Sequence, residues 1–184
     1  MIFANDKKTF LAKADKSKKG EIDARAIPII ETINKKDDYY TTSSCSGRVY
    51  FCQGKGKKNE MDWIIVSHDL INSDFLELGP SVGSYGLTSS IWLRIEPFIL
   101  HVACKDLDVA NKLLENARKL YKKSCLLTVC HKIVVEIRGS ELLEMPYVIN
   151  NIGVFSGDRG WLVNYINQEL QKIWDGMERF NESI

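Results

Sequence analysis

Apolar residues recur at helical spacing between Asp106 and Tyr121, and β-rich runs flank this segment on both sides, so few architectures remain open. The apolar positions of the helix are Leu107, Ala110, Leu113, Leu114, Ala117 and Leu120. Residues 91–95 and 98–104 precede the helix, residues 124–130 and 132–138 follow it, and all four runs are rich in residues favoured in strands. This order predicts an α+β fold, a single layered domain in which helices cover a mixed or antiparallel sheet.

Further helices are predicted at residues 5–13, 21–34 and 161–180, and further strands at residues 39–53 and 62–67. Pro28 lies inside the second of these helices, which either kinks there or divides into two short helices with Pro28 opening the second. Residues 72–90 are rich in glycine and serine and are expected to form a long loop. A Ser-Cys pair follows a helix at residues 44–45 and again at 124–125, which is consistent with a duplicated α-β-β unit.

The length and charge of the chain limit what it can bind. The 184 residues suffice for one domain, which we expect to span residues 1–184. The formal net charge of +1 gives no global attraction for polyanions, so any contact with nucleic acid must come from local clusters such as Lys16, Lys18 and Lys19. No apolar run has the length of a membrane span and no signal peptide is evident. We therefore expect a cytoplasmic protein with reduced thiols and no membrane association.

The stretch from Tyr39 to Arg48, YYTTSSCSGR, concentrates hydroxyl groups, a thiol, a glycine and a guanidinium. Hydroxyls both donate and accept hydrogen bonds, glycine lets the backbone approach a ligand, and the arginine fork suits a carboxylate or phosphate. Two interpretations are open. The stretch is either a turn between two strands that binds a ligand, or a polar hairpin that satisfies its own backbone.

Two more polar clusters lie at the ends of predicted strands: Ser67-His68-Asp69, and Glu96-Pro97 with His101 nearby. A histidine beside carboxylate and hydroxyl groups is a candidate general base, because imidazole titrates near neutral pH. The alternative is that each histidine is a structural residue tied to the backbone by a hydrogen bond.

Several motifs of known cofactor and metal sites are missing from the sequence. Neither a GxGxxG turn nor a Walker A loop occurs, which argues against a Rossmann cofactor domain. The cysteines lack the CxxC spacing of structural zinc sites, so no metal is expected. Ser46 is flanked by Cys45 and Gly47 and is not set in a nucleophile elbow.

The segments SSCSGR at residues 43–48 and EPFILHV at residues 96–102 are the most specific parts of the sequence. They occur together with Lys19-Gly20-x-Ile22-Asp23, Asn34, Trp63 and Ser67-His68-Asp69. In this order and spacing, the chain resembles the tRNA wybutosine-synthesizing protein 3 family from about Phe3 to Phe180. A bare single domain rich in lysine and isoleucine looks like an archaeal member.

The resemblance implies a methyltransferase that uses S-adenosylmethionine and acts on phenylalanine tRNA. The methyl group would go to the N4 nitrogen of a 4-demethylwyosine-type guanosine beside the anticodon. Such a base must leave its stack to enter a pocket, and its nitrogen must lose a proton to a nearby base or water.

Within this resemblance, we infer the roles of individual residues. His101 is the first candidate for the general base, because Glu96 and the surrounding strand are placed to orient it, and His68 is the second. Arg48 would bind a carboxylate or phosphate. The predicted cofactor site comprises Ser44, Cys45, Ser46, Gly47 and Arg48. The predicted substrate contacts, including aromatic rings for a splayed base, are Tyr39, Glu96, Tyr85, Trp92 and Lys19.

Two other functions fit the same residues. A non-catalytic RNA-binding module that presents tRNA to other enzymes would need basic patches on one face and no tight S-adenosylmethionine site. A small-molecule hydrolase or thiol enzyme centred on Ser44-Cys45-Ser46 would need a hydroxyl or thiol within hydrogen-bond reach of His68 or His101.

Overall fold

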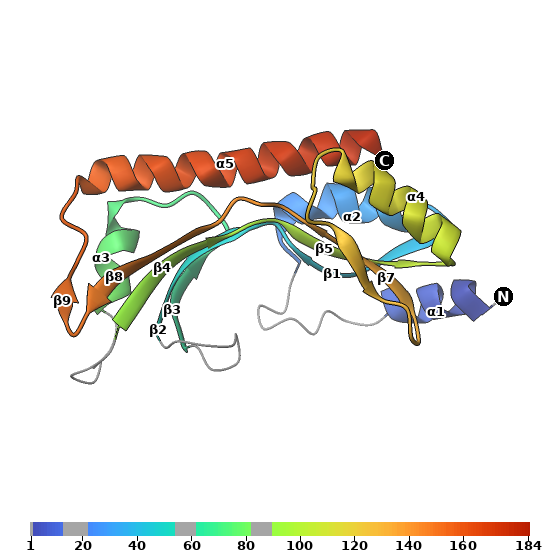
Figure 1. Ribbon diagram of the computed structural model, residues 1–184, viewed down its shortest axis with the longest axis horizontal. Helices are drawn as coiled ribbons and strands as arrows, with labels where there is room; N and C mark the ends of the chain where they lie inside the picture. Colours follow the sequence, from blue (N-terminus) through green and yellow to red (C-terminus); the bar gives the residue numbers. More distant parts are fainter. Residues whose placement is uncertain (1, 13–21, 54–61, 82–89) are drawn as a thin grey trace. The chain divides into compact units, whose positions relative to one another are not determined.

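The computed structural model describes residues 2–12, 22–53, 62–81 and 90–184 (Figure 1). The chain forms two compact units. The first unit comprises Met1–Ser46, Phe98–Ser140 and Ile173–Ile184, and the second comprises Gly47–Pro97 and Glu141–Lys172. Each unit contains one antiparallel sheet with helices, which confirms the predicted α+β class. The expectation of one domain over residues 1–184 stays a prediction.

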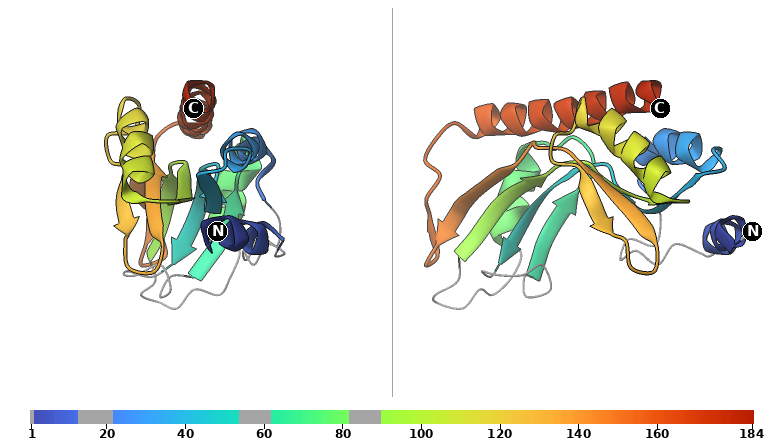
Figure 2. Two further views of the ribbon diagram at one scale, coloured as in Figure 1. Left: turned by 90° about the vertical axis from the view of Figure 1, so that its right-hand side faces the viewer. Right: turned by 45° about the vertical axis from the view of Figure 1, so that its right-hand side comes forward.

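The first unit is built on a sheet with the strand order β1-β5-β7-β6. Its strands are β1 (Tyr39–Cys45), β5 (Ile99–Cys104), β7 (Ile133–Arg138) and β6 (Cys125–Thr128). β6 and β7 pair as the hairpin that the sequence predicts. Helices α2 (Ile27–Asn34) and α4 (Leu107–Arg118) lie on one face of this sheet, and α1 (Ile2–Leu11) lies on the other (Figures 1 and 2).

The helices of the first unit follow from local sequence signals. In α4, the Asp106 side chain caps the first turn by accepting a hydrogen bond from the Val109 backbone N–H at 2.9 Å. Its buried positions are Ala110, Leu113, Leu114 and Ala117, which share one face. A short 3-10 helix, η1 (Ala24–Ala26), precedes α2, and Pro28 lies in the first turn of α2. The second of the two predicted alternatives for residues 21–34 is therefore confirmed.

The second unit is built on a sheet with the strand order β3-β2-β4-β8-β9. Its strands are β3 (Asp62–Ser67), β2 (Arg48–Gln53), β4 (Ser90–Glu96), β8 (Leu143–Ile149) and β9 (Ile152–Gly153). Along β4, the residues Ile91, Leu93 and Ile95 are buried and alternate with partly exposed ones.

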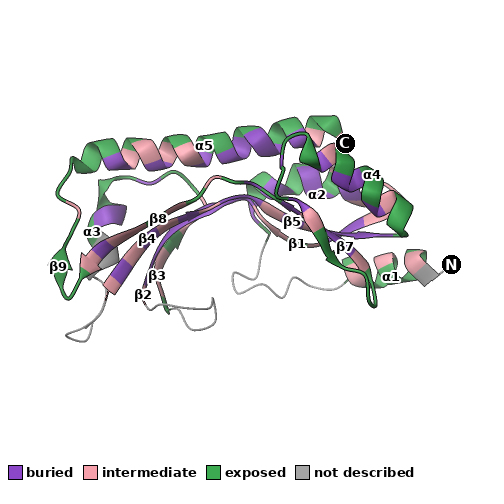
Figure 3. Cartoon of the chain, viewed as in Figure 1, coloured by how far each residue is buried: buried purple, intermediate pink, exposed green. Residues whose placement is uncertain are grey.

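Helix α3 (Ser73–Ser81) and the beginning of α5 (Arg159–Ser183) complete the second unit. The Phe75 ring of α3 stacks on Phe51 of β2, with ring centroids 5.7 Å apart. The side chain of Asn167 in α5 holds the backbone of Ile71 by two hydrogen bonds of 2.9 Å. Buried positions recur along one side of α5, as expected for the predicted amphipathic helix (Figure 3).

The structure decides several expectations about individual segments. Residues 39–53 form the predicted strand, turn and strand, but the alternative of a polar hairpin is wrong, because β1 pairs with β5 while β2 pairs with β3 and β4. Residues 73–81 are helical: the buried side chains of Phe75 and Leu76 stabilise a helix that the glycine and serine content argued against. β8 was not predicted, and α1 begins at Ile2 instead of Asn5. The two Ser-Cys segments also differ in topology, because a strand of the other sheet follows β1 whereas β6 pairs with β7.

Candidate functional site

The segment Ser46-Gly47 joins β1 to β2 and lies at the centre of the predicted polar stretch. Gly47 has a φ of 94°, in a region that only glycine enters without strain. The glycine therefore allows β2 to leave β1 and pair in a different sheet.

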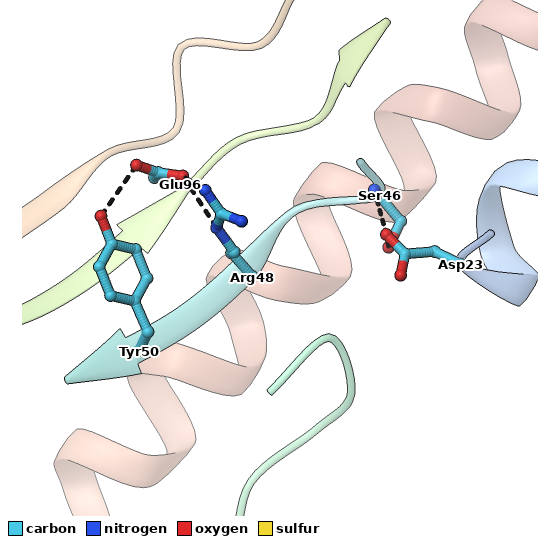
Figure 4. Close-up of polar contacts among 5 residues, drawn as sticks. All are labelled: Asp23, Ser46, Arg48, Tyr50 and Glu96. Carbon is cyan, nitrogen blue, oxygen red and sulfur yellow. Dashed lines mark hydrogen bonds and ion pairs between the residues drawn. The ribbon is translucent and has the colours of Figure 1, made fainter. Parts of the chain in front are cut away.

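Within the first unit, Asp23 holds the end of this polar stretch. One carboxylate oxygen of Asp23 accepts hydrogen bonds from the Ser46 backbone N–H at 3.0 Å and from the Ser46 hydroxyl at 3.2 Å (Figure 4). Both residues are buried, so the backbone donor of Ser46 would lack a partner without this carboxylate. Asp23 therefore fixes the conformation of the chain at Ser46, and it does so from the residue that precedes η1.

The same unit places His101 beside the serine-rich end of β1. In the antiparallel register of β1 and β5, His101 lies opposite Ser43, Leu100 opposite Ser44, and Ile99 opposite Cys45. The His101 Nε2 atom lies 3.0 Å from a carboxylate oxygen of Glu136, its direct neighbour on β7. A carboxylate in this position fixes the orientation of the imidazole ring, which a general base needs.

In the second unit, Arg48 and Glu96 lie directly opposite each other on β2 and β4. The Arg48 Nε donates to one Glu96 oxygen at 2.9 Å, and Arg48 Nη2 contacts the same oxygen (Figure 4). The Tyr50 hydroxyl donates to the other Glu96 oxygen at 2.8 Å. The Arg48 side chain is 10% exposed and that of Glu96 is 29% exposed, so this network is largely shielded from solvent.

Burial of Tyr50, followed by the nearby charge of Glu96 and the hydrogen bond to it, raises the pKa of the phenol to about 12. The hydroxyl therefore stays protonated at neutral pH and remains a donor. The two carboxylate oxygens of Glu96 accept hydrogen bonds from a cation, Arg48, and from a neutral donor, Tyr50.

Two aromatic rings, those of Trp63 and Tyr50, lie near the Arg48 guanidinium. Its central carbon lies 4.2 Å from the centre of the Trp63 ring and 5.4 Å from the centre of the Tyr50 ring. Trp92 and Arg94 precede Glu96 at alternating positions of β4 and therefore share its face of the sheet. The indole N–H of Trp92 is buried and has no hydrogen-bond partner among the described residues. A bound polar group could supply that missing partner.

The third predicted cluster begins at the end of β3. Ser67 lies opposite Val49, the residue after Arg48, so this cluster adjoins the start of β2. The Ser67 hydroxyl contacts the backbone of Asp69 and closes a tight turn around His68, which is half-buried. The second unit thus brings Arg48, Glu96 and the turn at His68 onto neighbouring strands.

The remaining residues predicted for the cofactor and substrate sites lie on β1 or outside the described residues. The Tyr39 hydroxyl donates to the Val109 carbonyl at 3.2 Å, and burial raises its pKa. Ser44 and Cys45 are half-buried on β1. Lys19 and Tyr85 lie outside the described residues.

Sequence reasoning missed Tyr50 and Glu136. Tyr50 could have been found, because it lies two residues after Arg48 on β2 and therefore points to the same face of the strand. Glu136 could not, because its contact with His101 depends on the register between β5 and β7. The expectation that Glu96 orients His101 stays a prediction, and the Glu96 carboxylate accepts hydrogen bonds from Arg48 and Tyr50.

Two buried thiols are poor nucleophiles. Burial, together with the charge of Asp106, raises the pKa of the Cys104 thiol to about 12, and burial also raises that of Cys52. Both remain protonated at neutral pH. Neither supports a thiol enzyme.

The arrangement suits recognition of a polar heterocycle. Arginine, carboxylate and hydroxyl groups can pair with the edges of a base, while tryptophan and tyrosine rings offer stacking faces. In the first unit, and considered by itself, the His101–Glu136 pair is a group that can accept a proton.

Comparisons with known proteins identify close matches over most of the chain. The family model described as "Methyltransferase TYW3" matches residues 5–184. A mouse protein named "tRNA wybutosine-synthesizing protein 3 homolog" is 33% identical over 78% of this chain, and the match spans 57% of the mouse protein. A Thermococcus kodakarensis protein is 32% identical over 89% of this chain and 84% of its own length. Its name is "tRNA(Phe) 7-((3-amino-3-carboxypropyl)-4-demethylwyosine(37)-N(4))-methyltransferase 1".

A solved structure gives the same result for the fold. The PH1069 protein from Pyrococcus horikoshii matches with a TM-score of 0.85 and 27% identity, over 99% of this chain and 97% of that one. Among the helices of the described residues, none has the length and apolarity required to cross a lipid bilayer.

Proposed function

The chain belongs to the methyltransferase TYW3 family, and we propose that it transfers a methyl group from S-adenosylmethionine to the N4 nitrogen of a 4-demethylwyosine-type guanosine in tRNA-Phe. The observation that carries this proposal is the family match over residues 5–184. The name of the Thermococcus relative supports the choice of tRNA, base and nitrogen.

The polar groups of residues 44–48 suit a methyl donor, and those around Glu96 suit a modified base. When bound, S-adenosylmethionine supplies an electrophilic methyl group on a sulfonium. We assign Ser44, Cys45, Ser46, Gly47 and Arg48 to its site. Asp23 orders this segment through Ser46, and Glu96 with Tyr50 orders Arg48, so both ends of the segment are held by buried hydrogen bonds. The unpaired indole N–H of Trp92 is a further donor for a bound polar group.

The chain's own residues orient the substrate and remove a proton. We assign His101 as the group that accepts the proton from the base, with Glu136 stabilising the imidazolium that forms. His68 is the second candidate for this role. Trp92, Glu96 and Tyr39 are the described residues that we assign to the substrate base.

A single-turnover methyl-transfer assay tests the proposal. Labelled S-adenosylmethionine is mixed with the protein and with tRNA from cells that lack this step. We expect label in the wyosine-type base with the parent protein and a loss of at least about 100-fold with His101→Ala, the usual scale for a general base. Arg48→Ala, which removes a group of the assigned cofactor site, should also lower the rate of methyl transfer. His131→Ala and Arg138→Ala are matched controls, because both side chains are exposed.

Circular dichroism of each variant separates loss of chemistry from loss of folding. If the parent binds the tRNA but transfers no methyl group, the chain is better explained as a module that presents tRNA to other enzymes. If both variants retain full activity, the assigned residues are wrong although the activity stands.

A further inference from the structure

A pocket of about 340 Å³ lies in the first unit between the start of α2 and the last turns of α5. Arg25 and Pro28 line it from the η1–α2 side, and Trp174, Met177, Glu178 and Asn181 line it from α5. Its volume is at the lower end of the range for small-molecule sites, which suits one functional group of a larger ligand. The residues inferred above for the cofactor or substrate do not include any of these six.

Two residues that line this pocket, Trp174 and Asn181, each carry one buried polar atom without a partner among the described residues. The indole N–H of Trp174 and the side-chain oxygen of Asn181 have no hydrogen-bond partner among the described residues. Trp174 is 1% exposed, so water does not readily satisfy its N–H. Buried donors and acceptors are nearly always paired in folded proteins. One unpaired donor and one unpaired acceptor in the same pocket indicate a ligand that offers the opposite groups.

The pocket is also lined by one positive and one negative side chain, Arg25 and Glu178. The Arg25 guanidinium lies over the Trp174 ring, 3.6 Å from its centre, so the positive charge is on the side of the unpaired donor. Glu178 lies one helical turn after Trp174, and Asn181 lies about 10 Å after Trp174 along the helix axis. The residues that line the pocket therefore supply both donors, Arg25 and Trp174, and acceptors, Glu178 and Asn181. Met177 and Pro28 provide apolar surface.

From this arrangement, we propose that the pocket binds a 3-amino-3-carboxypropyl group. Arg25 and the Trp174 N–H bind the carboxylate, Glu178 and the Asn181 oxygen bind the ammonium, and Met177 contacts the methylene carbons. A zwitterion matches this pattern because its two charges lie close together and need partners of opposite kind. The inference rests on the function proposed above, which supplies two molecules that carry this group.

The two sources are the methyl donor and the substrate. S-adenosylmethionine carries the group on its sulfonium, and the name of the Thermococcus relative places the same group on the base that it methylates. Arg25 is two residues after Asp23, which holds Ser46. The pocket and the serine-rich segment therefore both contact the short stretch from Asp23 to Pro28.

Binding measurements identify the first source. S-adenosylhomocysteine contains the group and 5′-methylthioadenosine lacks it, so calorimetry with both isolates its contribution. If the pocket holds the donor, Arg25→Gln and Glu178→Gln weaken binding of S-adenosylhomocysteine about tenfold to a hundredfold, the range for a hydrogen bond to a charged group, and leave binding of 5′-methylthioadenosine unchanged. Arg179→Gln and Glu182→Gln, two exposed changes on the same helix, are the matched controls.

Methyl transfer identifies the second source. Single-turnover rates are compared for tRNA whose base carries the 3-amino-3-carboxypropyl group and tRNA whose base lacks it. If the pocket holds the substrate, Arg25→Gln slows only the reaction of the tRNA that carries the group, and affinity for S-adenosylhomocysteine is unchanged.

The remaining outcomes separate this inference from the proposed function. The first outcome is that the parent methylates tRNA, and Arg25→Gln changes neither the preference for S-adenosylhomocysteine over 5′-methylthioadenosine nor the preference between the two tRNAs. The inference is then overturned and the function stands. If the parent methylates neither tRNA but binds S-adenosylhomocysteine in an Arg25-dependent way, the inference stands and the function fails. If the parent neither methylates tRNA nor binds S-adenosylhomocysteine, both are overturned. Thermal unfolding of each variant checks that Arg25→Gln remains folded without its contact to Trp174.

Discussion

Removal of the Tyr50 hydroxyl tests how tightly the Arg48–Glu96 network is held. Tyr50 is fully buried, and its hydroxyl donates to Glu96 at 2.8 Å. The substitution Tyr50→Phe keeps the ring and deletes only this donor. At pH 8, we expect it to lower the free energy of unfolding by about 1–2 kcal/mol, which lies between the values for a neutral hydrogen bond and for one to a charged group.

The stability difference between the parent and Tyr50→Phe depends on pH, and the raised pKa of Tyr50 determines the direction of this dependence. The folded-state pKa of Tyr50 is raised from 10.0 to about 12, so the neutral phenol contributes stability that is fully present below pH 10. That contribution is lost as the pH rises through 12, because the unfolded chain releases the proton first. Between these two values, the loss is about 1.4 kcal/mol per pH unit, which gives about 1.4 kcal/mol at pH 11 relative to pH 8.

Urea unfolding of the parent and Tyr50→Phe, followed by tryptophan fluorescence between pH 8 and pH 11, measures this difference directly. The other titrating groups act in both proteins and cancel when the two curves are subtracted. We expect the stability advantage of the parent to shrink by about 1.4 kcal/mol and to approach zero at pH 11. An advantage that stays constant over this range would show that the phenol is not shifted and that the network around Glu96 is open to water.

Three further substitutions test single contacts, each measured as a change in urea unfolding. Asp23→Ala leaves the buried backbone N–H of Ser46 without its acceptor and should cost about 1–3 kcal/mol; an unchanged midpoint would mean that water replaces the carboxylate. Gly47→Ala places a side chain at a φ of 94° and should cost about 1–2 kcal/mol, whereas a neutral result would show that the backbone relaxes. Asp106→Ala removes the cap that accepts from Val109 and should cost about 1 kcal/mol, and Asp106→Asn, which can still cap, should restore most of it.

The sequence predicted the elements whose signals are local. The α4 helix follows from its apolar spacing, and the strands predicted at 62–67 and 132–138 follow from their β-rich composition. Segments whose structure depends on distant partners were predicted less well. Residues 73–81 are helical because Phe75 and Leu76 are buried, a contact that local composition does not encode.

For the candidate site as well, the sequence indicated the residues but not their contacts. The residue types of SSCSGR and EPFILH were enough to select Arg48, Glu96 and His101, because clustered polar groups at strand ends are visible in the sequence. The pairing of these residues was not visible in the sequence, because the sequence of a strand does not specify which strand it pairs with or in which register. Only the tertiary structure decides that Arg48 lies opposite Glu96 on β4 and that His101 lies opposite Glu136 on β7, because hydrogen bonding between strands distant in the chain sets both contacts.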